Sequence, residues 1–307
     1  MIGGMRIGLF GGDTAGRTVD DVVTDAATAH AEGFASYWIP QIFGLDALTV
    51  LAVVAREVPD IELGTAVVPT YPRHPMTLAQ QALTVQSISD GRLVLGIGLS
   101  HQIVVEGIWG MSFEKPVRHM REFLTVLHAL VHTGKVAFDG ETLHANGSVD
   151  IKGASPMPIL LAALGTKMLE LAGRTADGTV TWMTGPTTLA EHVVPTIAAA
   201  ATAAGRAAPR VAVGLPILVS DDAEAARTRA AEVFQVYNML PSYRAMLDRE
   251  GPGGLADVAI VGDEDAVRAQ LERLAATGAT DLIAAEFAKL GSEERARTRA
   301  LLRSVTA

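Results

Sequence analysis

The sequence contains no cysteine, and this absence excludes several kinds of chemistry at once. A chain without Cys forms no disulfide, offers no thiolate to a metal ion and has no Cys nucleophile. The absence is also compatible with a reducing compartment, and we expect a cytoplasmic location. Catalysis, if present, must therefore rely on other side chains or on a bound cofactor.

Positive charge and long apolar runs are also scarce. The 25 Lys and Arg residues against 34 Asp and Glu leave a net charge of −9, whereas a nucleic-acid-binding domain needs a basic face. No run reaches the ~18 consecutive apolar residues that a membrane span requires, since the longest candidate, Ile197–Ala204, is too short. The first 16 residues lack the pattern of a signal peptide. We expect a soluble protein with no nucleic-acid and no membrane partner.

What the chain does contain is apolar residues, which make up 49% of its 307 positions. Short apolar runs alternate with longer helical patterns, and the runs are nearly continuous, as in parallel strands covered on both faces. The predicted strands are Arg6–Phe10, Ser36–Ile39, Ile61–Val67, Leu93–Gly98, Pro158–Ala162, Thr179–Trp182, Val211–Val219 and Asp281–Phe287. The predicted helices are Val19–Gly33, Asp46–Val58, Pro75–Ser89, Val117–Thr133, Thr166–Thr175, Thr187–Gly205, Asp222–Asp248 and Ala266–Thr277.

Strands that alternate with helices in this number favour an α/β fold, a (β/α)8 TIM barrel formed as one domain over residues 1–307. A doubly wound open sheet is the alternative, because periodicity does not separate the two. Two stretches interrupt the alternation. Lys135–Asp150 contains an Asp-Gly turn and predicts a β-hairpin insertion, and Phe234–Gly254 is a helical insertion before the last strand. In a barrel both insertions would lie near one rim and could shape a pocket.

Two glycine-rich motifs follow predicted strands. Gly11–Thr18 (GGDTAGRT) has the spacing of a phosphate loop, but Arg17 replaces the lysine that reaches between phosphates. An ordinary loop with Thr18 or Asp20 as helix N-cap is the stronger interpretation. Gly96–His101 (GIGLSH) begins like a dinucleotide fingerprint, yet His101 stands in place of the third glycine and no helix clearly starts at Ser100. Its glycines still allow a ligand or a strand to approach the backbone closely.

Further candidate sites are a helix start, a histidine pair and two tryptophans. Leu164-Gly165-Thr166-Lys167 opens a helix whose free amides would attract an anion, although every βα unit has such a start. His128 and His132 have the spacing of a metal pair but lack further ligands, and we predict no metal site. Trp38 and Trp182 end apolar runs and are interpreted as core residues, with the alternative that they flank a planar ligand at the barrel rim.

Taken together, these stretches resemble the luciferase-like monooxygenase superfamily, in particular its oxidoreductases that use coenzyme F420, a 5-deazaflavin. The most specific stretch is Ile61–Gly98 (IELGTAVVPTYPRHPMTLAQQALTVQSISDGRLVLGIG). Supporting stretches are residues 162–178 (AALGTKMLELAGRTADG), Thr179–Pro186 (TVTWMTGP) and Val261–Asp281 (VGDEDAVRAQLERLAATGATD). The resemblance extends over most of the chain and weakens in Val219–Val258.

The resemblance implies a (β/α)8 barrel, a homodimer, and a deazaflavin or flavin at the carboxyl ends of the strands. Ala66-Val67 would form a non-prolyl cis peptide that supports one face of the ring. Gly98, Leu99 and Ser100 would line the edge of the ring. The phosphate and tail would be received by Leu164, Gly165, Thr166, Trp182, Met183 and Thr184.

The sequence departs from the relatives that act on alcohols or sugar phosphates. These carry an Asp-His pair after the second strand and a Glu after the fourth, where this chain has Gln41-Ile42 and His101. His101 and Gln41 are therefore the candidate catalytic residues, since a histidine donates or accepts a proton near neutral pH. The resulting hypothesis is an oxidoreductase that transfers a hydride between F420 and a small organic substrate. An FMN-dependent monooxygenase and a non-catalytic cofactor-binding protein are the alternatives.

Overall fold

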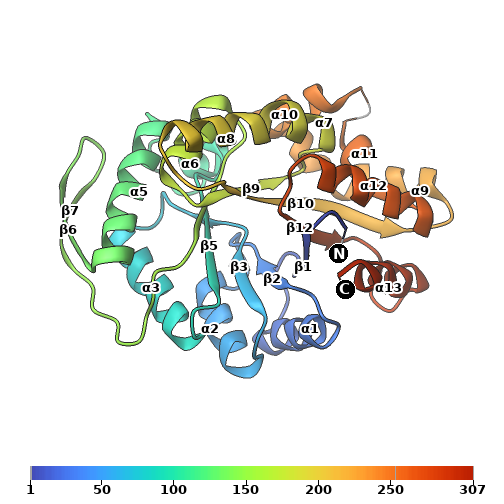
Figure 1. Ribbon diagram of the computed structural model, residues 1–307, viewed down its shortest axis with the longest axis horizontal. Helices are drawn as coiled ribbons and strands as arrows, with labels where there is room; N and C mark the ends of the chain where they lie inside the picture. Colours follow the sequence, from blue (N-terminus) through green and yellow to red (C-terminus); the bar gives the residue numbers. More distant parts are fainter. Residues whose placement is uncertain (1, 253, 307) are drawn as a thin grey trace.

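Parallel strands form a closed barrel at the centre of the molecule (Figure 1). The computed structural model describes residues 2–252 and 254–306, and within them eight parallel strands close through the β1–β12 and β9–β10 pairs. Around the barrel the strands follow in the order β1 (Arg6–Phe10), β2 (Ser36–Ile39), β3 (Glu62–Thr65), β5 (Leu93–Gly98), β8 (Ile159–Ala162), β9 (Gly178–Trp182), β10 (Arg210–Val219) and β12 (Asp281–Glu286). The predicted (β/α)8 barrel is confirmed, and the open sheet is excluded.

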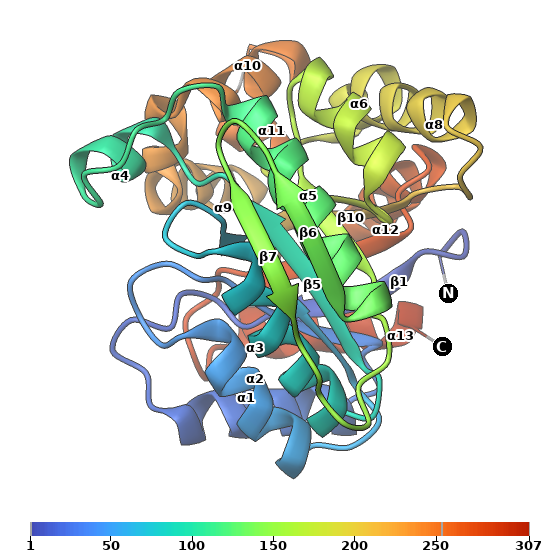
Figure 2. The same ribbon diagram turned by 90° about the vertical axis from the view of Figure 1, so that its left-hand side faces the viewer.

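Helices cover the outside of the barrel (Figures 1 and 2). The covering helices are α1 (Val19–Ala31), α2 (Ala47–Glu57), α3 (Pro75–Ile88), α5 (Pro116–Thr133), α6 (Thr166–Thr175), α8 (Val194–Ala203), α12 (Glu264–Ala276) and α13 (Glu293–Thr306). The last of these, α13, was not among the predicted helices. In the part of the chain described, no helix is both long enough and apolar enough to cross a membrane.

The two predicted insertions have different outcomes. The first is confirmed as an antiparallel hairpin of β6 (Lys135–Asp139) and β7 (His144–Ser148), which lies outside the barrel along α5 (Figure 2). The second is more broken than the helix predicted over Asp222–Asp248, because it divides into α9 (Ala223–Val233), η2 (Gln235–Met239) and α10 (Pro241–Glu250).

Proline explains this break. Pro241 has no N–H to donate to a preceding helical turn, and it disfavours the helical conformation in the residue before it. Leu240 accordingly has the extended angles φ −95° and ψ 115°, and α10 begins anew with Pro241 in its first turn. After the insertion the chain forms α11 (Leu255–Val258) and the short strand β11 (Ile260–Gly262), which extends the sheet beside β10.

A predicted strand is also interrupted. The strand predicted over Ile61–Val67 ends as β3 at Thr65, and after two residues the chain resumes as β4 (Val68–Pro69), which pairs with β5. The Thr65 hydroxyl donates to the Gly96 carbonyl (2.8 Å) and accepts from the Gly96 amide (2.9 Å), so the end of β3 is tied to β5.

Large side chains fill the inside of the barrel around Trp38, which is fully buried. Its ring lies over Gly64 on the neighbouring strand, where a Cβ atom would be 2.1 Å from the ring. Any larger residue at Gly64 would therefore displace the tryptophan. The other side chains of this inner cluster are Val94, Leu160, Val180, Ala212 and Ile283, with Phe10, Ala66 and Val67 packed against them.

The amino ends of the strands carry a charged cluster, the floor network, formed by Arg6, Glu62, Arg210 and Asp281. Arg210 donates to both carboxylates, at 2.6 Å to Asp281 Oδ1 and 2.6 Å to Glu62 Oε1, and its guanidinium lies 5.6 Å from the Trp38 ring centroid. Although burial opposes its charge, the hydrogen bonds to Asp281 and Glu62 raise the pKa of Arg210. The network therefore joins the amino ends of β1, β3, β10 and β12 by ion pairs.

Candidate active site

The carboxyl ends of all barrel strands meet at one end of the molecule, which we call the mouth. The cofactor-binding residues predicted from the resemblance follow β3, β5, β8 and β9, so the barrel brings all four groups to this end. The mouth is where (β/α)8 enzymes hold their active sites, because the βα loops converge there from different strands.

Between β3 and β4 the Ala66–Val67 peptide bond is cis, at the position that the resemblance implied. The Ala66 amide donates to the Ile39 carbonyl (2.9 Å), and both side chains pack on the inner cluster. Gly98 on β5 lies beside them, since a Cβ there would be 2.8 Å from Val67 Cγ2. We call these three residues the shelf (Ala66, Val67 and Gly98), in which Val67 packs where a side chain of residue 98 would begin.

The chain after β5 turns sharply into a short helix. Ser100 has φ +65°, and His101 is the N-cap of α4 (Gln102–Gly107), a helix that the sequence did not reveal. The His101 imidazole does not cap this helix; its ring centroid lies 5.5 Å from that of Tyr243. Burial lowers the pKa of His101, so near pH 7 it is a neutral ring with one donor and one acceptor nitrogen.

The chain after β8 leads into α6 through Leu164 and Gly165. The Leu164 carbonyl is held by His192 Nε2 (2.8 Å), which fixes the loop. Gly165 is the N-cap of α6 with φ −77° and ψ 150°, and no side chain caps this helix. A Cβ at Gly165 would meet no atom within 4 Å, and Thr166 beside it is exposed. The amino end of α6 is therefore open and suited to an anion.

The turn after β9 places an aromatic ring at the mouth. Trp182 lies 5.2 Å from Phe10 between ring centroids, and its indole Nε1 is buried without a hydrogen bond, although it lies beside the Tyr237 hydroxyl. Met183 is buried with φ +52°, and the Thr184 hydroxyl donates to the Trp182 carbonyl (3.2 Å).

A segment that sequence reasoning did not assign to the site lies against these residues. We call residues 234–250 the roof. Tyr237 contacts Trp182 (5.9 Å between centroids) and Tyr243 (5.0 Å), and Tyr243 contacts His101, so aromatic rings connect the ends of β9 and β5. The signal was present in the sequence, because Phe234, Tyr237 and Tyr243 are close together in a chain with only 5% aromatic residues.

The roof is attached to the barrel by its last residue. The Glu250 carboxylate accepts hydrogen bonds from the Thr187 amide (3.1 Å), the Thr188 amide (2.9 Å) and the Thr188 hydroxyl (2.9 Å). These amides open α7 (Pro186–Thr188), which continues through η1 (Leu189–Val193) into α8, and Figure 1 shows α10 beside α7. Two helix starts thus lie at the mouth, one occupied by Glu250 and the other, that of α6, open.

Replacing Glu250 with Ala is expected to loosen the roof. The variant loses three hydrogen bonds to a charged acceptor, at about 1–3 kcal/mol. We expect amide hydrogen exchange to become at least about tenfold faster in residues 241–250 and at Thr187 and Thr188. Mass spectrometry measures the exchange. Asp248→Ala is the control, because Asp248 is exposed and pairs with Arg244 on the same helix. Equal exchange in the two variants would show that Glu250 does not anchor the roof.

The second candidate catalytic residue has a structural contact. Gln41 Oε1 accepts from the Ala47 amide (2.7 Å) at the start of α2, so its carbonyl is engaged and its NH2 group is left for other contacts. Ile42 beside it is exposed, and no acid or base stands at this position. Of the two candidates, His101 is the one whose side chain contacts the roof.

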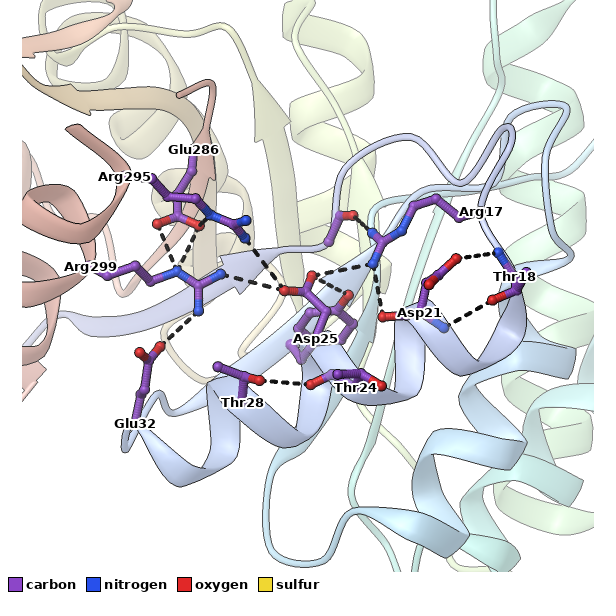
Figure 3. Close-up of polar contacts among 12 residues, drawn as sticks. Arg17, Thr18, Asp21, Thr24, Asp25, Thr28, Glu32, Glu286, Arg295 and Arg299 are labelled. Carbon is purple, nitrogen blue, oxygen red and sulfur yellow. Dashed lines mark hydrogen bonds and ion pairs between the residues drawn. The ribbon is translucent and has the colours of Figure 1, made fainter. Parts of the chain in front are cut away.

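The phosphate-loop interpretation of Gly11–Thr18 is not supported. Arg17 donates to the Gly11 carbonyl (2.5 Å) and the Asp21 carbonyl (3.0 Å) and pairs with Asp25 (Figure 3). Thr18 is the N-cap of α1 in a reciprocal capping box with Asp21, as the alternative predicted. The same Asp25 pairs with Arg295 and Arg299 of α13, so Arg17 belongs to the contact between the first and last helices.

The His128–His132 pair lies on α5, and His128 is near Asp177, which precedes the amino end of β9. The two rings stack at 5.7 Å between centroids, and among the described residues no group of three or more His, Cys, Asp or Glu side chains could hold a metal ion. His128 Nε2 is buried without a hydrogen-bond partner. Burial lowers the pKa of His128, with Asp177 opposing and His132 and Arg206 adding to the decrease.

This lowered pKa predicts acid sensitivity. In the unfolded chain the pKa of His128 is about 6.5, and in the folded protein it is lower, so at acid pH the unfolded chain binds the proton more readily. The contribution of His128 to the free energy of unfolding is therefore fully present above pH 6.5 and is lost as the pH falls below it. His128→Phe should reduce this loss, by up to about 1 kcal/mol between pH 7.5 and 5.5. Urea unfolding at a series of pH values measures it. Parallel pH profiles for the variant and the parent would contradict the assignment.

A cavity of about 550 Å³ lies beside the mouth, between the β4–α3 loop, the α4–α5 loop and the hairpin turn. Its wall includes Tyr71, whose hydroxyl is buried without a partner and whose ring stacks on His119 at 4.2 Å between centroids. Burial, followed by the Glu106 charge, raises the pKa of Tyr71 to about 12. None of the predicted cofactor residues lines this cavity, so it is separate from the shelf.

The closed parallel barrel, with its βα loops converging at one end, defines the class of fold, a (β/α)8 barrel. The family model for luciferase-like monooxygenases matches residues 5–300. The chain therefore belongs to the luciferase-like monooxygenase family, as the resemblance indicated.

Known proteins agree with this placement. The chain is 32% identical over 237 residues to a 5,10-methylenetetrahydromethanopterin reductase of Methanolobus tindarius, covering 76% of this chain and 72% of that protein. In fold it is similar to the coenzyme F420-dependent tetrahydromethanopterin reductase of Methanopyrus kandleri, with a TM-score of 0.79, 22% identity and coverage of 97% and 96%. It is also similar to the FMN complex of 3,6-diketocamphane monooxygenase of Pseudomonas putida, with a TM-score of 0.74, 19% identity and coverage of 98% and 96%.

Proposed function

We propose that this protein is an oxidoreductase that transfers a hydride between coenzyme F420 and a small organic substrate at the mouth. The observation that carries the proposal is the closed barrel of a luciferase-like monooxygenase family member, which brings the predicted cofactor residues together at the carboxyl ends of β3, β5, β8 and β9. The similarity to a methylenetetrahydromethanopterin reductase and to an F420-dependent reductase favours the deazaflavin over FMN.

The residues of the mouth fit such a cofactor in three respects. The shelf consists of Ala66, Val67 and Gly98 and carries no charged or long side chain. The buried Trp182 indole N–H has the Tyr237 hydroxyl beside it and could donate to a carbonyl of the ring. The uncapped amino end of α6, with Gly165, Thr166 and Lys167, offers backbone amides and a cation to a phosphate group. In this assignment Leu99 and Ser100 border the ring, and Met183 and Thr184 shape the turn that carries Trp182.

When bound, the deazaflavin would supply the hydride chemistry through its C5 position, and the protein would supply position and exclusion of water. His101 is the residue we assign to proton transfer, since its imidazole is neutral near pH 7 and lies at the end of β5. Gln41 would hold the β2–α2 loop and could orient substrate through its NH2 group.

The direct test titrates the purified protein with F420 and, separately, with FMN, and measures both affinities by isothermal titration calorimetry. We expect F420 to bind at least about tenfold more tightly than FMN, a difference of ~1.4 kcal/mol. Tight FMN binding without affinity for F420 would replace the proposal by the FMN-dependent monooxygenase. Binding of F420 with no hydride transfer to any compound in a substrate panel would favour the non-catalytic binding protein.

The implied homodimer and single-domain organisation belong to this proposal as well. Sedimentation velocity at several protein concentrations would measure the oligomeric state, and one cooperative unfolding transition would support one domain.

A further inference from the structure

We propose that the cavity beside the mouth, which we call the side cavity, binds a small organic acid, a molecule with an apolar or aromatic body and a carboxylate. It lies between the β4–α3 loop (residues 70–74), the α4–α5 loop (108–115) and the hairpin turn (140–143). Its volume of about 550 Å³ is that of a small-molecule site. No residue assigned to the cofactor lines it, so the inference goes beyond the proposed function and does not depend on it.

Hydrogen bonds between distant segments hold the walls of the side cavity in place. The buried carboxylate of Glu122 on α5 accepts from three backbone amides of the hairpin turn, those of residues 141–143, at 2.7 to 3.2 Å. His74 ties the β4–α3 loop to the hairpin. Its Nδ1 accepts from the Met76 amide (3.3 Å), which leaves the hydrogen on Nε2 to donate to the His144 carbonyl (3.1 Å). Protein contacts alone fix these walls, so a ligand would bind without ordering them first.

Arg73 is the charged group of the wall that has donors to spare. Its Nη2 donates to Asp46 (2.8 Å), whereas Nη1 and Nε have no hydrogen-bond partner in the described part of the chain. The side chain is only 17% exposed, so solvent shields its charge less than that of a surface arginine. Guanidinium N–H groups in such a position form charge-assisted hydrogen bonds with a carboxylate.

The carboxylates on the wall do not supply a partner for these donors. Glu141 is shared by Lys115 and Arg118, which places two cations on one carboxylate. Glu114 lines the cavity at an exposed position, where water screens its charge. The donors of Arg73 are therefore left for a negative group that the ligand brings.

Rings and apolar side chains form the rest of the wall. The Tyr71 ring stacks on His119, with 4.2 Å between centroids and 7° between planes, and lies 5.3 Å from the ring of Phe113. Burial raises the pKa of Tyr71 to about 12 and lowers that of His119, so both rings are neutral near pH 7. Met111 and Leu143 add apolar surface. One charged donor group beside apolar walls is the pattern that selects an organic acid.

Three probes with one ring system test the inference: 2-naphthoate, the uncharged 2-naphthamide and the cationic 2-naphthylmethylamine. The parent protein is titrated calorimetrically with each of them, without F420. We expect 2-naphthoate to bind at least about tenfold more tightly than either of the other two. The inference is overturned if 2-naphthoate does not bind, or if the amide or the amine binds as tightly. This measurement does not depend on any variant folding.

Arg73→Gln removes the charge and keeps a polar side chain. It should weaken 2-naphthoate binding at least about tenfold and change 2-naphthamide binding by no more than about threefold. Arg174→Gln is the matched control, because Arg174 is 60% exposed in the last turn of α6 and pairs with Glu170. It should leave the 2-naphthoate affinity within about twofold of that of the parent protein. An equal loss in both variants would overturn the inference, because the effect would then come from net charge alone.

A second pair of variants locates the ligand. Met111→Trp places a large ring on the wall of the side cavity and should weaken 2-naphthoate binding at least about tenfold. Ile108→Trp adds the same ring to the same loop, at a side chain that is 61% exposed and does not line the cavity. Its affinity should stay within about twofold of that of the parent protein. Equal affinities in the two variants would show that the acid binds elsewhere.

Titration with F420 separates this inference from the proposed function. F420 should not displace 2-naphthoate, because the residues of the side cavity differ from those assigned to the cofactor. Displacement would place the acid in the cofactor site and overturn the inference. A protein that binds 2-naphthoate in the side cavity but does not bind F420 contradicts the proposed function alone.

Discussion

Replacing Arg210 with Met is expected to lower the free energy of unfolding by about 3–5 kcal/mol. The substitution keeps the aliphatic stem near Trp38 and removes the charge that pairs with Asp281 and Glu62. Asp281 is only 1% exposed, so its carboxylate would remain buried with the weaker contact to Arg6 (3.5 Å). Leaving a buried charge without its partner is among the largest single-residue effects on stability.

Urea unfolding of Arg210→Met and of the control Arg244→Met measures this effect. Arg244 and Asp248 form an exposed pair one helical turn apart, with side chains 60% and 57% exposed, and such pairs contribute about 0.3–0.5 kcal/mol. A loss at Arg210 no larger than the loss at Arg244 would mean that the floor network does not stabilise the barrel.

Replacing Gly165 with Asp is expected to have opposite effects on stability and cofactor binding. The φ and ψ angles of Gly165 suit any residue, and a Cβ there meets open space, so an aspartate can cap α6. The cap should add a few tenths of a kcal/mol of stability, roughly 0.2–0.5. If the F420 phosphate binds these amides, the new carboxylate occupies them and repels it, and F420 affinity should fall by at least about tenfold.

Gly165→Asn is the matched control, since asparagine caps a helix as well as aspartate and carries no charge. Both variants should show a higher thermal midpoint than the parent protein. F420 titration should show a loss at least about tenfold larger for Asp than for Asn. Equal F420 affinity in all three proteins would place the phosphate away from α6 and would require a different orientation of the cofactor.

Much of the barrel was predictable from local patterns. The strands from Arg6–Phe10 to Asp281–Glu286 appear in the sequence as nearly continuous apolar runs, because a parallel strand is covered by helices on one face and by the barrel interior on the other. The hairpin of β6 and β7 follows from its Asp-Gly turn. The cis peptide at Ala66–Val67 was predictable only through the family resemblance, because local sequence carries no general signal for a non-prolyl cis bond.

The roof was not predictable from local patterns. Residues 222–248 have helical composition, and only the position of Pro241 hints at the break before α10. The contact between Glu250 and Thr188 joins residues 62 positions apart, and nothing near either residue reports the other. Arg17 differs, because its partners Gly11, Asp21 and Asp25 are nearby in the sequence, and these contacts do not support the phosphate-loop interpretation.

The sequence alone therefore determined the class of fold, the absence of thiol chemistry and the family, because these depend on composition, periodicity and motifs within single stretches. The tertiary structure decided which helix start at the mouth is open and which is occupied, and it brought the tyrosines of the roof against Trp182 and His101. These are contacts between distant segments. They depend on the closure of the barrel, which places every strand end at one mouth whatever its position in the chain.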